Sequence, residues 1–236
     1  CPSSLPLPVL MMVPLCAAKI EIVRRRVPFV PIECVVFDLG NVLVEWDRRL
    51  LYEQLIDDPV DLDRFLDEVL TLDVNADLDR GVALAEVTDA LAARHPQYAA
   101  LIEAFRDRWV ETLGEIIEGS VRILEELAAT DVRLLALSNW GRDTFAVAEP
   151  TLPFLRHFEA LVISGREGVV KPDPAIFELL CARHDVAPDR AVFIDDSAAN
   201  IATARDLGFA TVHFTAPEPC RRELVALGLD LRDPAS

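Results

Sequence analysis

The fold of this chain is decided by residues 34–41, which read CVVFDLGN. A short, continuous apolar run of this kind is typical of a strand that is buried on both faces of a parallel sheet. Asp38 ends the run, and Gly40 follows two positions later. Open α/β sheets bind their ligands at the carboxyl ends of their strands, so Asp38 is the first candidate for a functional residue.

Short apolar runs recur along the chain, and amphipathic stretches alternate with them. The runs that we expect to be strands are residues 32–37, 132–137, 160–163, 191–194 and 210–213. The stretches that we expect to be helices beside them are residues 121–129, 174–184, 198–207 and 221–227. This alternation predicts an α/β fold, a doubly wound parallel sheet with right-handed crossovers.

One interval breaks the alternation. Between residues 48 and 119 no run looks like a strand, and apolar residues recur at helical spacing, as in Leu84, Val87 and Leu91. Helices are expected at residues 50–55, 61–70, 84–94 and 98–113. We therefore expect residues 48–114 to form a helical cap over the carboxyl edge of the sheet, because a crossover of this length is unusual. Residues 31–47 and 115–236 are expected to form a Rossmann-like core.

Residues 1–30 are expected to be a leader of uncertain origin outside the fold. Their apolar run is interrupted by Pro6, Pro8 and Pro14 and falls short of the roughly 20 apolar residues of a membrane helix. Their three consecutive arginines follow the apolar run, whereas a secretory signal carries its basic residues before it.

The composition argues against some classes of partner. The formal net charge is −17, which disfavours binding to nucleic acids or to anionic membranes, because both need clustered Lys and Arg. The five cysteines are scattered, without the spacing of a zinc or redox site, and this fits a reducing cytoplasm. The sequence leaves open whether the protein is a monomer or a homodimer.

Polar clusters fall at the carboxyl ends of separate predicted strands. Because parallel strands end at one edge of a sheet, we expect these clusters to converge on one pocket. They are Asp38, the pair Ser138-Asn139, Lys171 in the segment GVVKPDP, and the pair Asp195-Asp196, with Asn200 one helical turn further on.

The chemistry of these clusters is complementary. Carboxylates from two strands offer the hard oxygen ligands that Mg²⁺ prefers. Asp38 could attack phosphorus and form an acyl phosphate. A hydroxyl, an amide and Lys171 could hold the phosphoryl oxygens, and such positioning is most of what phosphoryl transfer requires. Taken singly, each group also fits a structural role as a turn cap, a helix cap or a solvated loop residue, but their joint occurrence in this order favours chemistry.

Together these segments resemble the four motifs of the haloacid dehalogenase-like hydrolase superfamily. The resemblance covers about residues 32–227 and is strongest for the helical-cap phosphatases similar to α-D-glucose-1-phosphate phosphatase. It implies hydrolysis of a small phosphorylated metabolite, in which Asp38 would be the nucleophile. Ser138 and Asn139 would hold the phosphoryl group, and Lys171 would neutralise charge on the nucleophile and the phosphate.

The resemblance also implies a Mg²⁺ site. Asp38 and Asp195 would bind the metal, with Asp196 as a further ligand or as a partner behind the ligands. The backbone carbonyl of Gly40 would complete the site, and Asn200 would brace the loop that carries the paired carboxylates.

Gly40 departs from most phosphatases of the superfamily, which carry a second aspartate there to protonate the leaving oxygen. General acid–base catalysis contributes about 10²–10⁴-fold, so we expect slow turnover, a good leaving group or an acid borrowed from the cap. Two alternatives remain, a metal-independent 2-haloacid dehalogenase and a non-catalytic phosphate-binding or regulatory protein with a degenerate site. Asp195 and Asp196 favour the phosphatase, because near Asp38 they would repel an anionic haloacid unless a cation lay between them.

Two further residues are expected to contact the substrate. Trp140 directly follows Ser138-Asn139 and is the best placed of the three tryptophans to line the pocket, although packing in the core is an equally good role for it. Arg80 lies in the predicted cap and could bind a distal anionic group, although arginines are more often solvated at the surface.

Overall fold

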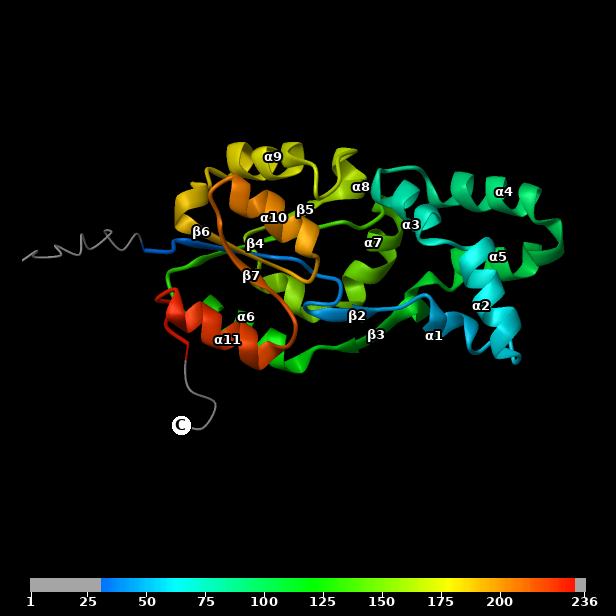
Figure 1. The fold of residues 1–236 in the computed structure, drawn as a ribbon, viewed down its shortest axis with the longest axis horizontal. Helices are drawn as coiled ribbons and strands as arrows, with labels where there is room; N and C mark the ends of the chain where they lie inside the picture. The colour runs from blue at the N-terminus through cyan, green and yellow to red at the C-terminus, as the bar shows by residue number, and fades with distance from the viewer. Residues whose placement is uncertain (1–30, 232–236) are drawn as a thin grey trace, which may run out of the picture.

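A five-stranded parallel sheet organises the protein. The computed structural model describes residues 31–231, and Figure 1 shows the sheet between two layers of helices. The predicted α/β fold with a doubly wound parallel sheet is therefore confirmed. In spatial order the strands are β5 (Ala160–Ile163), β4 (Arg133–Ser138), β1 (Cys34–Phe37), β6 (Ala191–Asp195) and β7 (Ala210–His213).

The central strand β1 is buried on both faces. Val35 and Phe37 pack into one apolar cluster and Cys34 and Val36 into another, as the alternation of side chains along a strand requires. Helices α9 (Pro174–His184) and α10 (Ala198–Asp206) cover one face, and α6 (Glu118–Ala128) and α11 (Pro217–Ala226) cover the other (Figure 1). Two buried faces explain why the strand reads as a continuous apolar run.

A two-stranded antiparallel ribbon joins the sheet to a group of helices. The ribbon pairs β2 (Val44–Trp46) with β3 (Leu113–Ile116), so the chain leaves and re-enters the α/β body at one place (Figure 1). Between these strands lie α1 (Arg49–Tyr52), α2 (Pro59–Glu68), α3 (Leu72–Asp79), α4 (Leu84–Arg94) and α5 (Ala99–Asp107). We call residues 48–112 the helical segment.

The helical segment has apolar packing of its own. The Tyr52 and Phe65 rings lie 4.7 Å apart between centroids, and Phe65 and Tyr98 lie 5.4 Å apart. Helix α2 begins with Pro59, and the Asp58 side chain accepts hydrogen bonds from the backbone N–H groups that would otherwise be unpaired. Local sequence signals of this kind explain why the segment forms helices.

Several sequence expectations were wrong in detail. The interval 48–119 contains strand β3, whose sequence LGEI is too short and too polar to read as a buried run. Ser138 and Asp195, expected just after their strands, are the last residues of β4 and β6. The sequence also did not predict α3 or α7 (Arg142–Ala148).

The end of α3 is held against the α/β body by close backbone approaches. A Cβ atom added at Gly141 would lie 3.0 Å from the Leu78 side chain, and one at Gly81 would lie 2.9 Å from the Gly165 carbonyl oxygen. The Leu84 backbone N–H, at the start of α4, donates to the Asp143 carboxylate at 2.9 Å. These contacts fix the helical segment relative to the sheet edge.

The expected leader, residues 1–30, lies outside the described residues. Among the helices of residues 31–231, none combines the length and the apolar character that a transmembrane span requires.

We expect Gly165→Ala to destabilise the protein. An alanine Cβ there would lie 2.4 Å from the Arg142 backbone nitrogen and 2.7 Å from the Trp140 carbonyl oxygen, and backbone atoms cannot move aside individually. Overpacking of this kind costs about 1–3 kcal/mol, which urea unfolding measures. Gly40→Ala is the matched control, since its Cβ meets no atom within 4 Å. Equal unfolding midpoints for the two variants would contradict the packing argument.

Candidate active site

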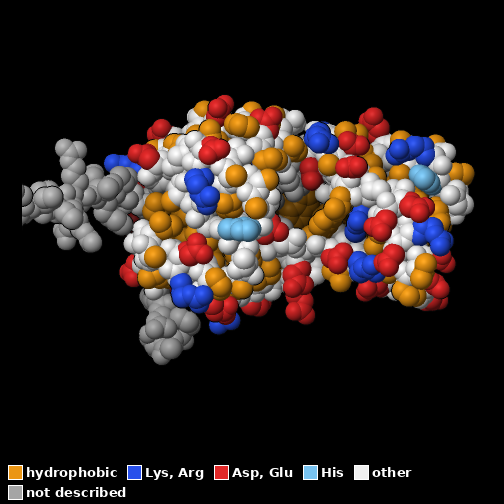
Figure 2. Space-filling model, viewed as in Figure 1, with side chains coloured by type: hydrophobic (Ala, Val, Ile, Leu, Met, Phe, Trp, Pro, Cys, Tyr) orange, Lys and Arg blue, Asp and Glu red, His pale blue; other side chains and the backbone are white. Residues whose placement is uncertain are grey.

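The polar residues gather where the sheet changes winding direction. From β1 the chain continues to β4 on one side, and β6 then occupies the other side of β1. The carboxyl ends of β1 and β6 therefore flank the position at which open α/β sheets bind ligands. A cavity of about 510 Å³ opens there, and Figure 2 shows a hollow with apolar walls between the α/β body and the helical segment.

Asp38 enters this cavity from the end of β1 and is nearly buried. Its Oδ1 accepts hydrogen bonds from the Leu39 backbone N–H at 2.7 Å and from the Ser138 hydroxyl at 2.8 Å, and its Oδ2 lies 3.0 Å from Lys171 Nζ. Burial raises the pKa of Asp38 to about 7, and the nearby Asp195 adds to this, while the Lys171 ammonium acts against it. Lys171 therefore favours the ionised, nucleophilic form of the carboxyl group.

Lys171 is a buried cation between two carboxylates. Its Nζ donates to Asp195 Oδ2 at 2.7 Å and to the Leu137 carbonyl oxygen at 2.9 Å, in addition to its contact with Asp38. Burial acts to lower its pKa, but Asp38 and Asp195 outweigh burial, so the pKa lies above the usual value for lysine. The side chain is charged and cannot readily give up a proton.

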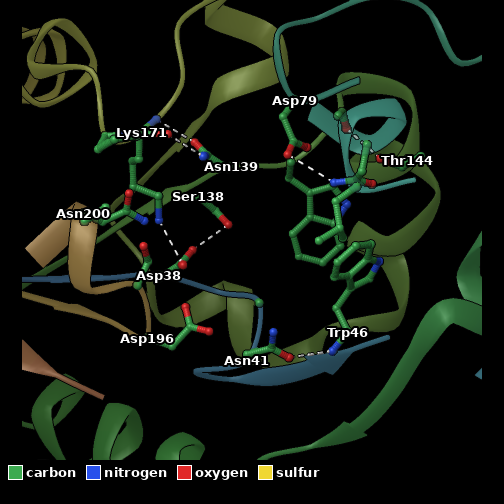
Figure 3. A pocket seen from close by; sticks show the side chains of 18 of the residues that line it. Asp38, Asn41, Trp46, Asp79, Ser138, Asn139, Thr144, Lys171, Asp196 and Asn200 are labelled. Atoms are coloured by element: carbon green, nitrogen blue, oxygen red, sulfur yellow. Dashed lines mark hydrogen bonds and ion pairs between the residues drawn. The ribbon is translucent and has the colours of Figure 1, made fainter. Parts of the chain in front are cut away.

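Asn139 holds the lysine segment in place. Its side-chain oxygen accepts from the Lys171 backbone N–H at 2.8 Å, and its side-chain nitrogen donates to the Lys171 carbonyl oxygen at 2.9 Å. Figure 3 shows Asn139 beside Lys171 and Ser138 beside Asp38. Both residues line the cavity, and in this structure both ends of the Asn139 amide are bonded to the Lys171 backbone.

Asp195 and Asp196 have different surroundings. Asp195 is fully buried, and its two oxygens accept from Lys171 Nζ, from Asn200 Nδ2 and from the Ser197 backbone N–H. Asp196 is exposed and lines the cavity. Burial, together with the charge of Asp195, raises the pKa of Asp196. The geometry therefore favours Asp196 as the more accessible metal ligand, where the resemblance had implied Asp195 first.

The donor set fits a divalent cation. Asp38, Asp195 and Asp196 each offer a carboxylate oxygen, and these atoms lie within 4.8 Å of one another. Gly40 lines the same cavity. Oxygen ligands with few carboxylates and open positions suit Mg²⁺. Asn200 braces the group, because its amide donates to both oxygens of Asp195 at 3.0 Å.

The turn after Asp38 is shaped by Asn41. Asn41 has a positive φ of 55°, a conformation that asparagine tolerates better than most residues. Its side-chain oxygen accepts from the Trp46 backbone N–H at 3.0 Å, which ties the turn to β2 (Figure 3). Sequence reasoning did not assign this function, although Asn after Gly is a recognisable turn signal.

Tryptophans form the apolar wall of the cavity. Trp46, Trp109 and Trp140 all line it, and the Trp109 and Trp140 rings lie 5.7 Å apart between centroids. Trp140 is thus both a lining residue and a core residue, at 6% exposure. Within residues 31–231 none of the three buried indole N–H groups has a hydrogen-bond partner.

Arg80, expected to contact the substrate, lies outside the cavity lining. Its side chain is 56% exposed, and its guanidinium lies 3.6 Å from the Asp77 carboxylate. The preceding residue, Asp79, lines the cavity instead, together with Asn75. Side chains of successive helical residues point about 100° apart, so Asp79 can face the cavity while Arg80 does not. The sequence prediction selected Arg80 for its charge and could not see this difference in direction.

The comparison with protein families identifies the class of protein. The model of the haloacid dehalogenase-like hydrolases matches residues 32–208. The chain therefore belongs to the haloacid dehalogenase-like hydrolase family, and the resemblance seen in the four sequence motifs is confirmed.

Individual relatives are more distant. A stretch of 80 residues is 41% identical to mouse Acyl-CoA dehydrogenase family member 10, covering 34% of this chain and 8% of that protein. The chain thus spans a small part of this relative. D-ribitol-5-phosphate phosphatase of Bacteroides thetaiotaomicron is 25% identical over 203 residues, which cover 83% of this chain and 98% of that protein.

A solved structure supports the fold. The HAD family enzyme bt-2542 of Bacteroides thetaiotaomicron, in complex with magnesium and inorganic phosphate, superposes with a TM-score of 0.61. The two chains are 23% identical, and the superposition covers 78% of this chain and 95% of the other.

We expect Lys171→Met to destabilise the protein strongly. The substitution leaves Asp38 and Asp195 as buried carboxylates without their cation, and breaking such a buried pair costs about 3–5 kcal/mol. Urea unfolding in metal-free buffer measures the loss. Arg106→Met is the control: Arg106 has three ion-pair partners, but it is 37% exposed, and surface pairs contribute about 0–1 kcal/mol. Similar losses for both variants would contradict the argument from burial.

Proposed function

We propose that the protein is a Mg²⁺-dependent phosphomonoester hydrolase that forms an aspartyl phosphate on Asp38. The observation that carries the proposal is the arrangement around this carboxylate. Asp38 is held by Ser138 and Lys171, it lines the cavity, and the carboxylates of Asp195 and Asp196 lie beside it. Nucleophile, phosphoryl-binding groups and metal ligands thus meet in one place, as phosphoryl transfer requires.

The residues act on the phosphoryl group by attack and positioning. Asp38 attacks phosphorus through a carboxylate oxygen, and the oxygen of the alcohol leaves from the opposite side. The Ser138 hydroxyl and the Lys171 ammonium, both within 3.0 Å of Asp38, are placed to bind the phosphoryl oxygens. When bound, Mg²⁺ supplies further neutralisation of phosphoryl charge, and Asp38, Asp196, Asp195 and the Gly40 carbonyl would hold it.

The relatives support this reading. One is named as a phosphatase of D-ribitol 5-phosphate, and the structural neighbour was crystallised with magnesium and inorganic phosphate. We infer a small phosphorylated metabolite as the substrate, whose part beyond the phosphate would lie against the tryptophan wall. The free cysteines among the described residues support the proposed location in a reducing cytoplasm.

The helical segment acts in this proposal as a cap domain over the catalytic core. The proposed division is residues 31–47 and 115–236 for the core and residues 48–114 for the cap. Its support is that α3 contributes Leu72, Asn75 and Asp79 to the cavity, whereas the core contributes the residues of the strand ends. The cap would therefore select the substrate, and the core would carry out the reaction.

The proposal predicts Mg²⁺-dependent hydrolysis of para-nitrophenyl phosphate by the purified chain. Chelation by EDTA and the substitution Asp38→Asn should each reduce activity to the background rate, because the first removes charge neutralisation and the second removes the nucleophile. Unchanged activity after either treatment would refute the proposal. Halide release from 2-haloacids without metal would favour the dehalogenase alternative instead.

Asn200→Ala should weaken the metal site without removing a ligand. Loss of a residue that hydrogen-bonds to a metal ligand typically lowers metal affinity by about 10–100-fold. The Asn200 amide donates hydrogen bonds to both oxygens of Asp195. The measurement is the Mg²⁺ concentration that gives half-maximal activity. Asp206→Asn, at the exposed end of the same helix, is the control and should leave this concentration unchanged. An unchanged value in Asn200→Ala would show that the metal does not depend on Asp195.

A further inference from the structure

The site lacks an obvious proton donor near the position that Gly40 occupies. Gly40 has no side chain, and a Cβ atom built there would meet nothing within 4 Å. Lys171 is a poor donor, because Asp38 and Asp195 hold its pKa above the usual value. Expulsion of an alkoxide from phosphorus nevertheless benefits from protonation of the leaving oxygen. Another residue must supply that proton if the enzyme cleaves esters of ordinary alcohols.

Among the described residues that line the cavity, one titratable residue has no assigned role. The described residues that line the cavity include four with ionisable side chains: Asp38, Asp79, Lys171 and Asp196. Three of these have a role in the proposed function: Asp38 as the nucleophile, Lys171 as the buried cation and Asp196 as a metal ligand. Asp79 remains, and it enters the cavity from the helical segment, whereas the others come from the sheet edge (Figure 3).

Asp79 is held in a defined position but keeps hydrogen-bonding capacity. Asp79 is the last residue of α3. The residue before it, Leu78, packs against Gly141, and the turn after it packs through Gly81 against Gly165. The Asp79 carboxylate accepts a hydrogen bond from Asn75 Nδ2 at 3.2 Å, and within residues 31–231 no basic side chain forms an ion pair with it. The group is therefore fixed without being neutralised by a direct partner.

The surroundings of Asp79 suit proton transfer near neutral pH. Burial raises its pKa to about 7, and the charge of Lys171, the Asn75 hydrogen bond and the charge of Arg80 act in the opposite direction. A general acid is most effective when its pKa is close to the working pH, because both the acid and its conjugate base are then populated.

We infer that Asp79 is the general acid and base of this site, supplying from the helical segment the function that a side chain at position 40 would supply from the core. The inference rests on the proposed phosphatase function. In the first step Asp38 forms a bond to phosphorus, the bond from phosphorus to the ester oxygen breaks, and the Asp79 carboxyl proton passes to that oxygen. In the second step water attacks phosphorus and gives a proton to the Asp79 carboxylate, and the bond from phosphorus to Asp38 breaks.

Two aryl phosphates distinguish this role from a structural one. Phenyl phosphate releases a basic phenolate that needs a proton, whereas para-nitrophenyl phosphate releases a stable anion that does not. We expect Asp79→Asn to lower kcat/KM for phenyl phosphate by about 10²–10⁴-fold and to lower it much less for para-nitrophenyl phosphate. The ratio kcat/KM reports the steps up to release of the phenol, so slower hydrolysis of the phosphoenzyme does not obscure the comparison.

A control variant and a rescue variant complete the experiment. Asp77→Asn, an exposed carboxylate on the same helix, should leave both values of kcat/KM unchanged. Gly40→Asp in the Asp79→Asn background should recover turnover of phenyl phosphate, because position 40 has room for a side chain.

The inference is overturned if Asp79→Asn lowers kcat/KM by the same factor for both esters or leaves both values unchanged. It is also overturned if the rescue variant hydrolyses phenyl phosphate no faster than Asp79→Asn does. Should Asp79→Asn fail to fold, as a thermal melt would show, Asp79→Ser is to be compared on the same two esters. Loss of all activity in Asp38→Asn and with EDTA, combined with equal effects of Asp79→Asn on both esters, would leave the phosphatase function standing and remove only the role of Asp79.

Discussion

The structure of this site depends on one buried cation, the ammonium group of Lys171. It neutralises Asp38 from β1 and Asp195 from β6, and it also donates to the end of β4 through the Leu137 carbonyl oxygen. Burial of two carboxylates at the edge of an apolar sheet would be prohibitively unfavourable without such a partner. The same contact that stabilises the fold therefore favours the ionised form of Asp38, against the effect of burial, and fixes the position of its carboxylate.

The sequence predicted the structure best where the backbone arrangement alone determines the surroundings of a residue. Strands buried on both faces read as continuous apolar runs, and this is why all five strands of the sheet were located, including β1 and β6. Lys171 was also expected at the end of a strand, but it lies in a turn beyond α8 (Ser164–Glu167) and reaches Asp38 because Asn139 holds its backbone. Asp38 and Ser138 were predicted to converge because the ends of parallel strands share an edge, and the structure brings them within hydrogen-bonding distance. These inferences follow from backbone geometry and need no knowledge of side-chain packing.

Features that depend on long-range packing could not be predicted in this way. The ribbon strand β3 is short and polar, and its strand character comes from pairing with β2 across the whole helical segment. Asp79 faces the cavity and Arg80 does not, a difference set by the way α3 packs on Gly141 and Gly165. Likewise, Asp195 is buried and Asp196 is accessible, and the partners that Asp195 finds include Lys171, which is distant along the chain, as well as the nearby Asn200.

The ribbon of β2 and β3 has a consequence for how such a protein can diversify. The helical segment leaves the core after β2 and returns to it through β3, and these two strands are paired, with Val44 opposite Ile116. The two ends of the helical segment therefore stay together whatever sequence lies between them. The length and composition of the helical segment can therefore change without shifting the register of the parallel sheet. Under the proposed division of roles, selectivity and reactivity would be encoded in separable stretches of sequence, and only a few points of contact, such as Gly141 against Leu78, would constrain both.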